Sequence, residues 1–169
     1  TILVDATDLA DDTAVNLNGA SNFDVSALKG NLVADAASGT LGIALSDAAD
    51  INIQTARTAT IDAAAMSIGN TLELEGTGDI TVNNVDADID ASGDGGASAL
   101  TGDLTVNTDA IDVDTNSLMN ITTGSASTTV NGDDADPDDT DTIDIVVDAT
   151  AMADQSDDTV LRLQGDAEY

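Results

Sequence analysis

Short segments in which aliphatic and polar residues alternate recur along the whole chain. Ile51–Ile53, Ile80–Val82 and Leu104–Val106 are examples, each with Asn or Thr at the middle position. Alternation with a period of two is the pattern of a strand that buries one face and solvates the other. We predict strand centres near residues 15, 23, 32, 42, 52 and 61, near 73, 81 and 89, and near 112, 120 and 129, so that a strand recurs every eight to ten residues within each group.

The sequence also repeats itself over longer distances. Asp5–Gly19 returns as Asp62–Gly76 and again as Asp148–Gly165, and Ser26–Leu32 returns as Ser98–Leu104. Long-period repetition of units with a shorter strand rhythm is typical of stacked architectures, in which each unit buries its apolar row against its neighbours. The sequence therefore predicts an all-β fold, a parallel β-solenoid of the β-helix or β-roll kind, with an antiparallel β-sandwich as the alternative. Residues 1–169 are expected to form a single β-repeat domain that belongs to a longer array.

The net charge restricts the possible partners of this chain more than the length of the chain does. There are 33 acidic residues and three basic ones, which gives a formal net charge of −30. Phosphate binding needs clustered Lys and Arg, so nucleic acid is not expected as a partner. An anionic membrane surface would repel the chain, and no apolar run approaches the ~20 residues of a membrane helix. Disorder is the alternative for so acidic a chain, but hydrophobic residues make up 41% and fall in regular clusters, which favours folding.

The materials for catalysis are scarce. The chain contains no His, which removes the commonest general base, and no Cys, which excludes disulfides and thiolate metal sites. The aromatic residues are Phe23 and Tyr169 alone, too few for a sugar-binding platform. The basic residues Lys29, Arg57 and Arg162 are scattered, although a lyase acting on acidic polysaccharides would need them together. We therefore expect a protein that is not an enzyme.

Runs of aspartate are the candidate metal ligands. Calcium takes six to eight oxygen ligands, and Asp at alternate positions of a turn can converge on one ion. The densest run is residues 133–141, for which a solvated loop is the alternative, and the turn of the long repeat is acidic in its first and third copies. Asp90 and Asp94 lie in a Gly-rich insertion that is either a further site or a flexible excursion. The predicted Ca²⁺ ligands are Asp133, Asp134, Asp136, Asp138, Asp139 and Asp141 in the run, and Asp8, Asp11, Asp12, Asp154, Asp157 and Asp158 in the repeated turn.

One stretch carries a resemblance to a known group of proteins. Thr123–Asp134 resembles a degenerate glycine- and aspartate-rich nonapeptide of RTX-type secreted proteins, although the strict Gly-Gly-x-Gly-x-Asp repeat is not intact. That resemblance implies a calcium-bound parallel β-roll and export by one-step type I secretion. The Thr-, Ala-, Asn- and Asp-rich composition along the whole chain is similar to the repeat regions of bacterial surface-layer proteins and giant adhesins.

These features together predict an extracellular structural module of a bacterial cell-surface protein, in a surface layer, an adhesin stalk or a filament. Its expected partners are other copies of itself or neighbouring repeat modules, and cell-surface polysaccharide, with no membrane insertion. A binding module that recognises glycan or ice through outward Thr and Asn is the alternative function. High salt is the alternative to calcium as the source of charge screening, because acidic, Lys-poor composition also marks proteins of salt-loving organisms.

Overall fold

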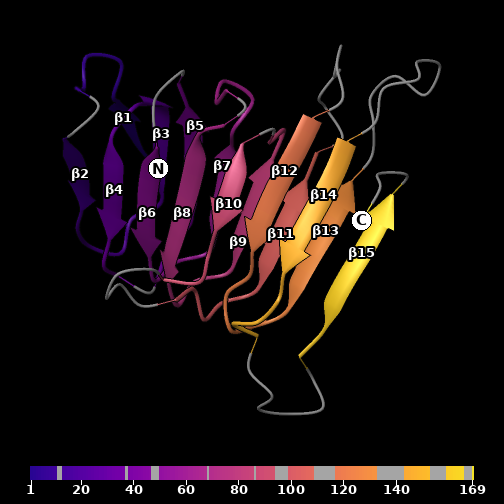
Figure 1. Cartoon of the computed structure of the whole chain (residues 1–169). Helices are drawn as coiled ribbons and strands as arrows, with labels where there is room; N and C mark the ends of the chain where they lie inside the picture. The colour runs from indigo at the N-terminus through magenta and orange to yellow at the C-terminus, as the bar shows by residue number, and fades with distance from the viewer. Residues whose placement is uncertain are drawn as a thin grey trace.

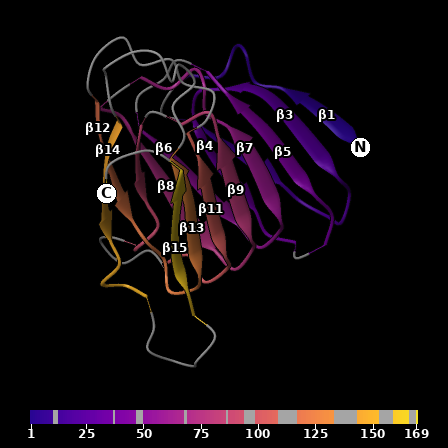
Figure 2. The ribbon, with the colours of Figure 1, turned by 90° about the vertical axis from the view of Figure 1, so that its right-hand side faces the viewer.

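In the computed structural model the chain winds into a parallel β-solenoid with two sheets (Figures 1 and 2). The structure describes residues 1–10, 13–36, 38–46, 50–67, 69–85, 87–93, 99–108, 117–132, 143–152, 159–165 and 169. The odd-numbered strands form one sheet, called the odd sheet below: β1 Ile2–Asp5, β3 Phe23–Leu28, β5 Leu41–Leu45, β7 Ala59–Asp62, β9 Ile80–Asn83, β11 Leu104–Asn107, β13 Thr128–Gly132 and β15 Leu161–Gly165. The even-numbered strands form the other, the even sheet: β2 Ala14–Leu17, β4 Asn31–Ala34, β6 Ile51–Thr55, β8 Thr71–Gly76, β10 Asp88–Asp90, β12 Ser117–Thr122 and β14 Ile143–Asp148.

Each strand pairs in parallel with the strand two places away in the chain, so consecutive strands alternate between the sheets. The predicted solenoid is therefore confirmed, and the antiparallel sandwich is wrong. The predicted strand centres fall inside strands, except the one near residue 112, which lies outside the described residues. Among the residues with a described structure, none forms a helix long and apolar enough to cross a lipid bilayer.

The core consists of aliphatic columns that run along the stack between the two sheets. One position on each of the six odd-sheet strands from β3 to β13 is filled by a β-branched residue that is at most 3% exposed. Each such Val or Ile contributes ~1.5–3 kcal/mol by leaving water, and it does so only when the neighbouring coils cover it. The column runs through Val25, Ile43, Ile61, Val82, Val106 and Val130.

The three copies of the long repeat share two features among the residues that the structure describes. In each copy the first residue, Asp5, Asp62 or Asp148, accepts a hydrogen bond at Oδ1 from the backbone N–H two residues later, at 3.0, 3.3 and 2.9 Å. This Asx turn ends the incoming strand and starts the corner. Each copy closes on a glycine with positive φ, 95° at Gly19, 107° at Gly76 and 95° at Gly165.

The third copy faces the other way in the solenoid. The first copy joins β1 to β2 and the second joins β7 to β8, so both cross from the odd sheet to the even sheet. The third joins β14 to β15 and crosses from the even sheet to the odd one. The same sequence pattern therefore serves on either side of the stack, and the repeating structural unit is half a coil.

The corners that lead from the even sheet to the odd sheet stack with their backbones in contact. A Cβ added at Gly78 would lie 1.9 Å from the carbonyl oxygen of Arg57, and one added at Gly102 would lie 2.1 Å from that of Gly78. Only glycine permits this approach. The Thr-Gly-Asp sequence that begins at Thr77 and again at Thr101 marks this stacked corner.

Candidate functional site

The predicted calcium ligands fall almost entirely on parts of the chain that the structure does not describe. Asp8 is the described one, and it is exposed in the turn that follows β1. The other eleven lie outside the described residues. Within the described segments, no group of three or more Asp or Glu side chains is arranged to hold a metal ion. The predicted calcium sites therefore stay predictions.

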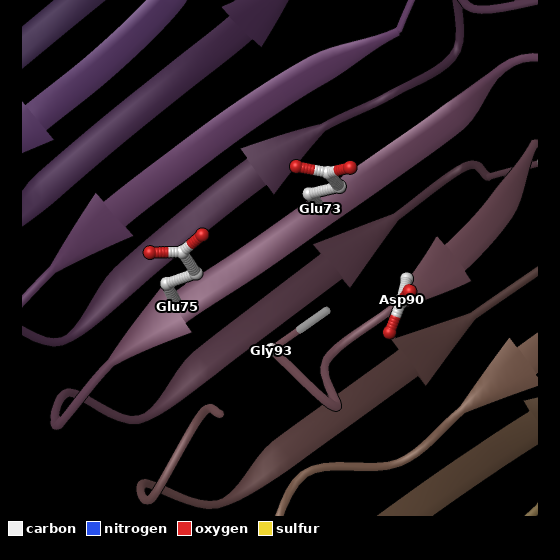
Figure 3. A pocket seen from close by; sticks show the side chains of 4 residues that line it. All are labelled: Glu73, Glu75, Asp90 and Gly93. Atoms are coloured by element: carbon white, nitrogen blue, oxygen red, sulfur yellow. The ribbon is translucent and has the colours of Figure 1, made fainter. Parts of the chain in front are cut away.

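The structure brings two glutamates together that the sequence did not single out. Glu73 and Glu75, called the acidic pair below, lie on the outward face of β8 and line a small hollow with Asp90 and Gly93 (Figure 3). Asn52 on the neighbouring strand donates from Nδ2 to Glu73 Oε2 at 2.9 Å and to Glu75 Oε1 at 2.8 Å. One neutral amide thus bridges two like charges, which lowers their repulsion without a cation.

Many described aspartates have a structural role as hydrogen-bond acceptors. Four of them accept a backbone N–H from the next coil of their own sheet or corner, over 2.7–3.3 Å, and so tie adjacent coils together. Asn22 and Asn31 do the same, each at 3.0 Å, so the fold accepts Asp or Asn for this contact. We call the four aspartates the coil-linking aspartates: Asp50, Asp79, Asp88 and Asp103.

The outward face of the odd sheet is neutral over three coils. Strands β9, β11 and β13 each present Thr and Asn at the same two outward positions, and all six side chains are half-buried. The Asn amides form a ladder, in which Asn107 donates from Nδ2 to Asn83 Oδ1 at 2.7 Å and Asn131 donates to Asn107 Oδ1. This Thr/Asn face consists of Thr81, Asn83, Thr105, Asn107, Thr129 and Asn131.

The pKa values of two exposed carboxyl groups, those of Asp5 and Asp148, are lowered. The hydroxyl and the backbone N–H of Thr7 both donate to Asp5 and hold its pKa below the ordinary value. At the equivalent position of the third copy, the backbone N–H and then the hydroxyl of Thr150 lower the pKa of Asp148. Hydrogen bonds to the ionised form cause both shifts, which are features of the Asx turn.

One cation lies inside the solenoid. Arg57, in the corner between β6 and β7, is fully buried, and its guanidinium lies 4.9 Å from the centroid of the Phe23 ring. Its Nη1 donates to the carbonyl oxygen of Ser21 at 2.6 Å and its Nη2 to that of Gly19, while Nε has no partner. The side chain thus reaches across the coil that contains Gly39, whose added Cβ would lie 3.1 Å from Nη1. The sequence offers no signal for this role beyond the scarcity of cations and aromatic rings.

No protein-family model, curated protein or solved structure matches the chain. The resemblance to RTX-type, surface-layer and adhesin repeats therefore stays a prediction. Function therefore has to be inferred from the solenoid and its charge distribution.

Proposed function

We propose that this chain is a non-catalytic, extracellular structural module of a bacterial cell-surface protein, in a surface layer, an adhesin stalk or a filament. The observation that carries the proposal is the aliphatic column that runs without a break through the odd sheet from β3 to β13. Every coil is covered by the next, so the module acts as a rigid spacer. Eight parallel strands at ~4.8 Å give it a length of roughly 34 Å.

We propose further that calcium relieves the repulsion among its carboxylates. The coil-linking contacts do not require charge, because Asn22 and Asn31 make the same bond as the four coil-linking aspartates. The net charge of −30 is therefore a property that the fold tolerates rather than needs. Divalent cations in the solvent would stabilise such a surface. The predicted aspartate ligands offer the oxygen atoms that calcium prefers.

Thermal unfolding followed by circular dichroism tests the calcium proposal. The midpoint should be higher in millimolar calcium chloride than in chelator with sodium chloride at the same ionic strength. A variant with all four coil-linking aspartates changed to Asn keeps their acceptor oxygens and lowers the charge by four. It should be more stable than the natural chain in chelator. A midpoint that chelator leaves unchanged, or a chain that needs molar sodium chloride and ignores calcium, would exclude calcium in favour of high salt.

A second candidate function is recognition of a neutral ligand, glycan or ice, by the Thr/Asn face. Three coils repeat Thr-x-Asn in register on a surface without carboxylates, although the chain as a whole is strongly acidic. Thr105→Asp would place a charge at the centre of this face, and Asn16→Asp would place the same charge at an exposed position of the even sheet. Binding to a glycan array or to ice should be lost in the first variant and kept in the second. Equal binding by both variants would contradict this function.

A further inference from the structure

The Thr and Asn columns of the Thr/Asn face differ in how their polar groups are satisfied. The Asn amides bond to one another along the ladder, where Nδ2 of each donates to Oδ1 of the Asn in the preceding coil. The hydroxyls of Thr81, Thr105 and Thr129 make no hydrogen bond to any residue that the structure describes. The amides are therefore held in place by the protein itself, whereas the hydroxyls are left for solvent or a ligand.

The column of threonines extends one coil beyond the Thr/Asn face. Thr60 on β7 lies beside Thr81, so four Thr residues follow one another from β7 to β13. Neighbouring strands of a sheet lie ~4.8 Å apart, and alternate residues of one strand lie ~6.6 Å apart. The β-branched Thr side chain is stiff at χ1. The face is therefore a rigid array in which hydroxyl and methyl groups recur at fixed intervals.

The face is neutral although the chain is strongly acidic. Charged outward neighbours lie at its two sides, with Asp62 beside Asn83 on β7 and Arg162 beside Thr129 on β15. The acidic pair lies on the outward side of the other sheet. Because the chain carries a net charge of −30, an anionic polymer would be repelled before it reached this face. A neutral ligand meets no such barrier here.

The Thr/Asn face lacks the features by which proteins hold sugars and small molecules. Such sites are concave and lined by aromatic and apolar side chains, with a few polar groups that are free to bind. The six side chains of the face come from adjacent strands of one sheet (Figure 2) and include no ring. Its amides, which would be the main donors to sugar hydroxyls, already bond to one another. A repeating array without a ring fits a ligand that is itself a repeating solid.

We infer that the Thr/Asn face binds ice, with the hydroxyl and methyl groups of the Thr column in contact and the Asn ladder as their rigid support. This inference rests on the second candidate function proposed above and names its ligand. Ice is a neutral lattice of hydrogen-bond donors and acceptors, and each Thr hydroxyl can donate to one water molecule and accept from another. Since the side chains are ordered before the contact forms, little conformational entropy is lost on binding. Contacts to single waters are weak, so several coils act together.

Extending the array by one coil gives the first test. Asp62→Asn continues the Asn column beside Asn83 and keeps an acceptor oxygen for the Asn84 amide and the Ala64 N–H. Thermal hysteresis, the gap between the melting and freezing points of an ice crystal in the protein solution, should increase several-fold. Asp24→Asn removes the same charge from β3, two strands away, and should leave the gap unchanged. An equal increase in both variants would make net charge the cause and overturn the inference.

A bulky ring at the centre of the face separates ice from a sugar as the ligand. Thr105→Tyr raises a ring that keeps a rigid solid away from the neighbouring coils, whereas a sugar gains a surface on which to stack. Thermal hysteresis and partition into slowly growing ice should fall several-fold in this variant, and binding to a glycan array should not. Thr122→Tyr places the same ring at a half-buried position of β12 in the even sheet and should keep the ice binding of the natural chain. Circular dichroism melts establish that both variants fold.

Three results would overturn the inference, and they differ in what they leave standing. A natural chain that binds neutral glycans but shows no thermal hysteresis at any concentration would keep the second candidate function, with a sugar as its ligand. A chain that binds neither glycan nor ice would remove that function as well. Equal loss of ice binding in Thr105→Tyr and Thr122→Tyr would show that the contact with ice does not lie on the Thr/Asn face.

Discussion

Replacing Arg57 by alanine should loosen the coils at the N-terminal end of the solenoid far more than replacing Arg162 by alanine. The Arg57 guanidinium is fully buried, whereas Arg162 is exposed on β15. The two substitutions remove the same side chain and the same charge. Their difference therefore measures what the interior contacts of Arg57 contribute.

The magnitude follows from the contacts of the guanidinium. Two charge-assisted hydrogen bonds to the carbonyls of Gly19 and Ser21 contribute about 3–6 kcal/mol together, and the desolvated contact with the Phe23 ring contributes about 2 kcal/mol. Removing a buried charge returns several kcal/mol of desolvation free energy. A net loss of about 3 kcal/mol remains, equal to roughly 6–12 °C in melting temperature for a chain of this size. Arg162→Ala should cost less than about 0.5 kcal/mol.

Thermal melts combined with hydrogen exchange locate the effect. In a stack with nearest-neighbour contacts, a lesion in one corner opens the coils beside it before the others. Amides of β2 to β6 should exchange faster in Arg57→Ala, while those of β9 to β13 should keep their protection. If Arg57→Ala melts within 1 °C of Arg162→Ala, or if exchange rises evenly along the stack, the buried cation does not link the coils in the way described.

Four further substitutions test other contacts. Gly78→Ala should cost about 3 kcal/mol or more in a urea melt because its Cβ would lie 1.9 Å from the carbonyl oxygen of Arg57, whereas Gly69→Ala, at a φ of 88° with no atom within 4 Å, should cost about 1–2 kcal/mol. Because the pKa of Asp5 is lowered in the folded chain, its carboxylate adds stability above the ordinary pKa of 3.8. That stability is lost as the pH falls through the lower folded pKa. NMR titration should show this loss, and Asp5→Asn should abolish the pH dependence. Asn52→Asp places a third carboxylate beside the acidic pair. It should lower the unfolding free energy by about 1–3 kcal/mol at low ionic strength, and calcium chloride should restore that free energy. Equal midpoints for Asn52→Asp and the natural chain would show that the amide bridge does not stabilise the pair.

The strands could be predicted from sequence because burial acts on every second residue. Ile80, Val82, Leu104 and Val106 face the core and the Thr and Asn between them face outward, so the period of two is visible without any tertiary information. β1 was not among the predicted segments. Ile2–Val4 is an unbroken apolar run, because both faces of this strand carry aliphatic residues.

Contacts between coils were less visible in the sequence. The acidic pair is bridged by Asn52, 21 and 23 residues away, and Arg57 reaches Gly19 across 38 residues. The sequence separation of such pairs follows from the number of residues in each coil, which depends on corner lengths. The corner after β3 has two residues, whereas the one after β10 extends from 91 to 103, and neither length follows from the strand pattern. The sequence also did not predict that one repeat serves both crossings, from the odd to the even sheet and from the even to the odd. The three repeat copies themselves were recognised.

Strands and corners place different limits on charge in this stack. The inward positions of the strands are filled mainly by aliphatic side chains, and the outward positions face neighbours about 4.8 Å away, where like charges repel. A corner can differ in length from one coil to the next without altering the register of the strands. Acidic segments such as 133–141, which lies between β13 and β14 in the sequence, are where we predict calcium ligands. A cation that binds these acidic segments would stabilise the stack from outside the core, while the aliphatic columns and Arg57 stabilise it from within.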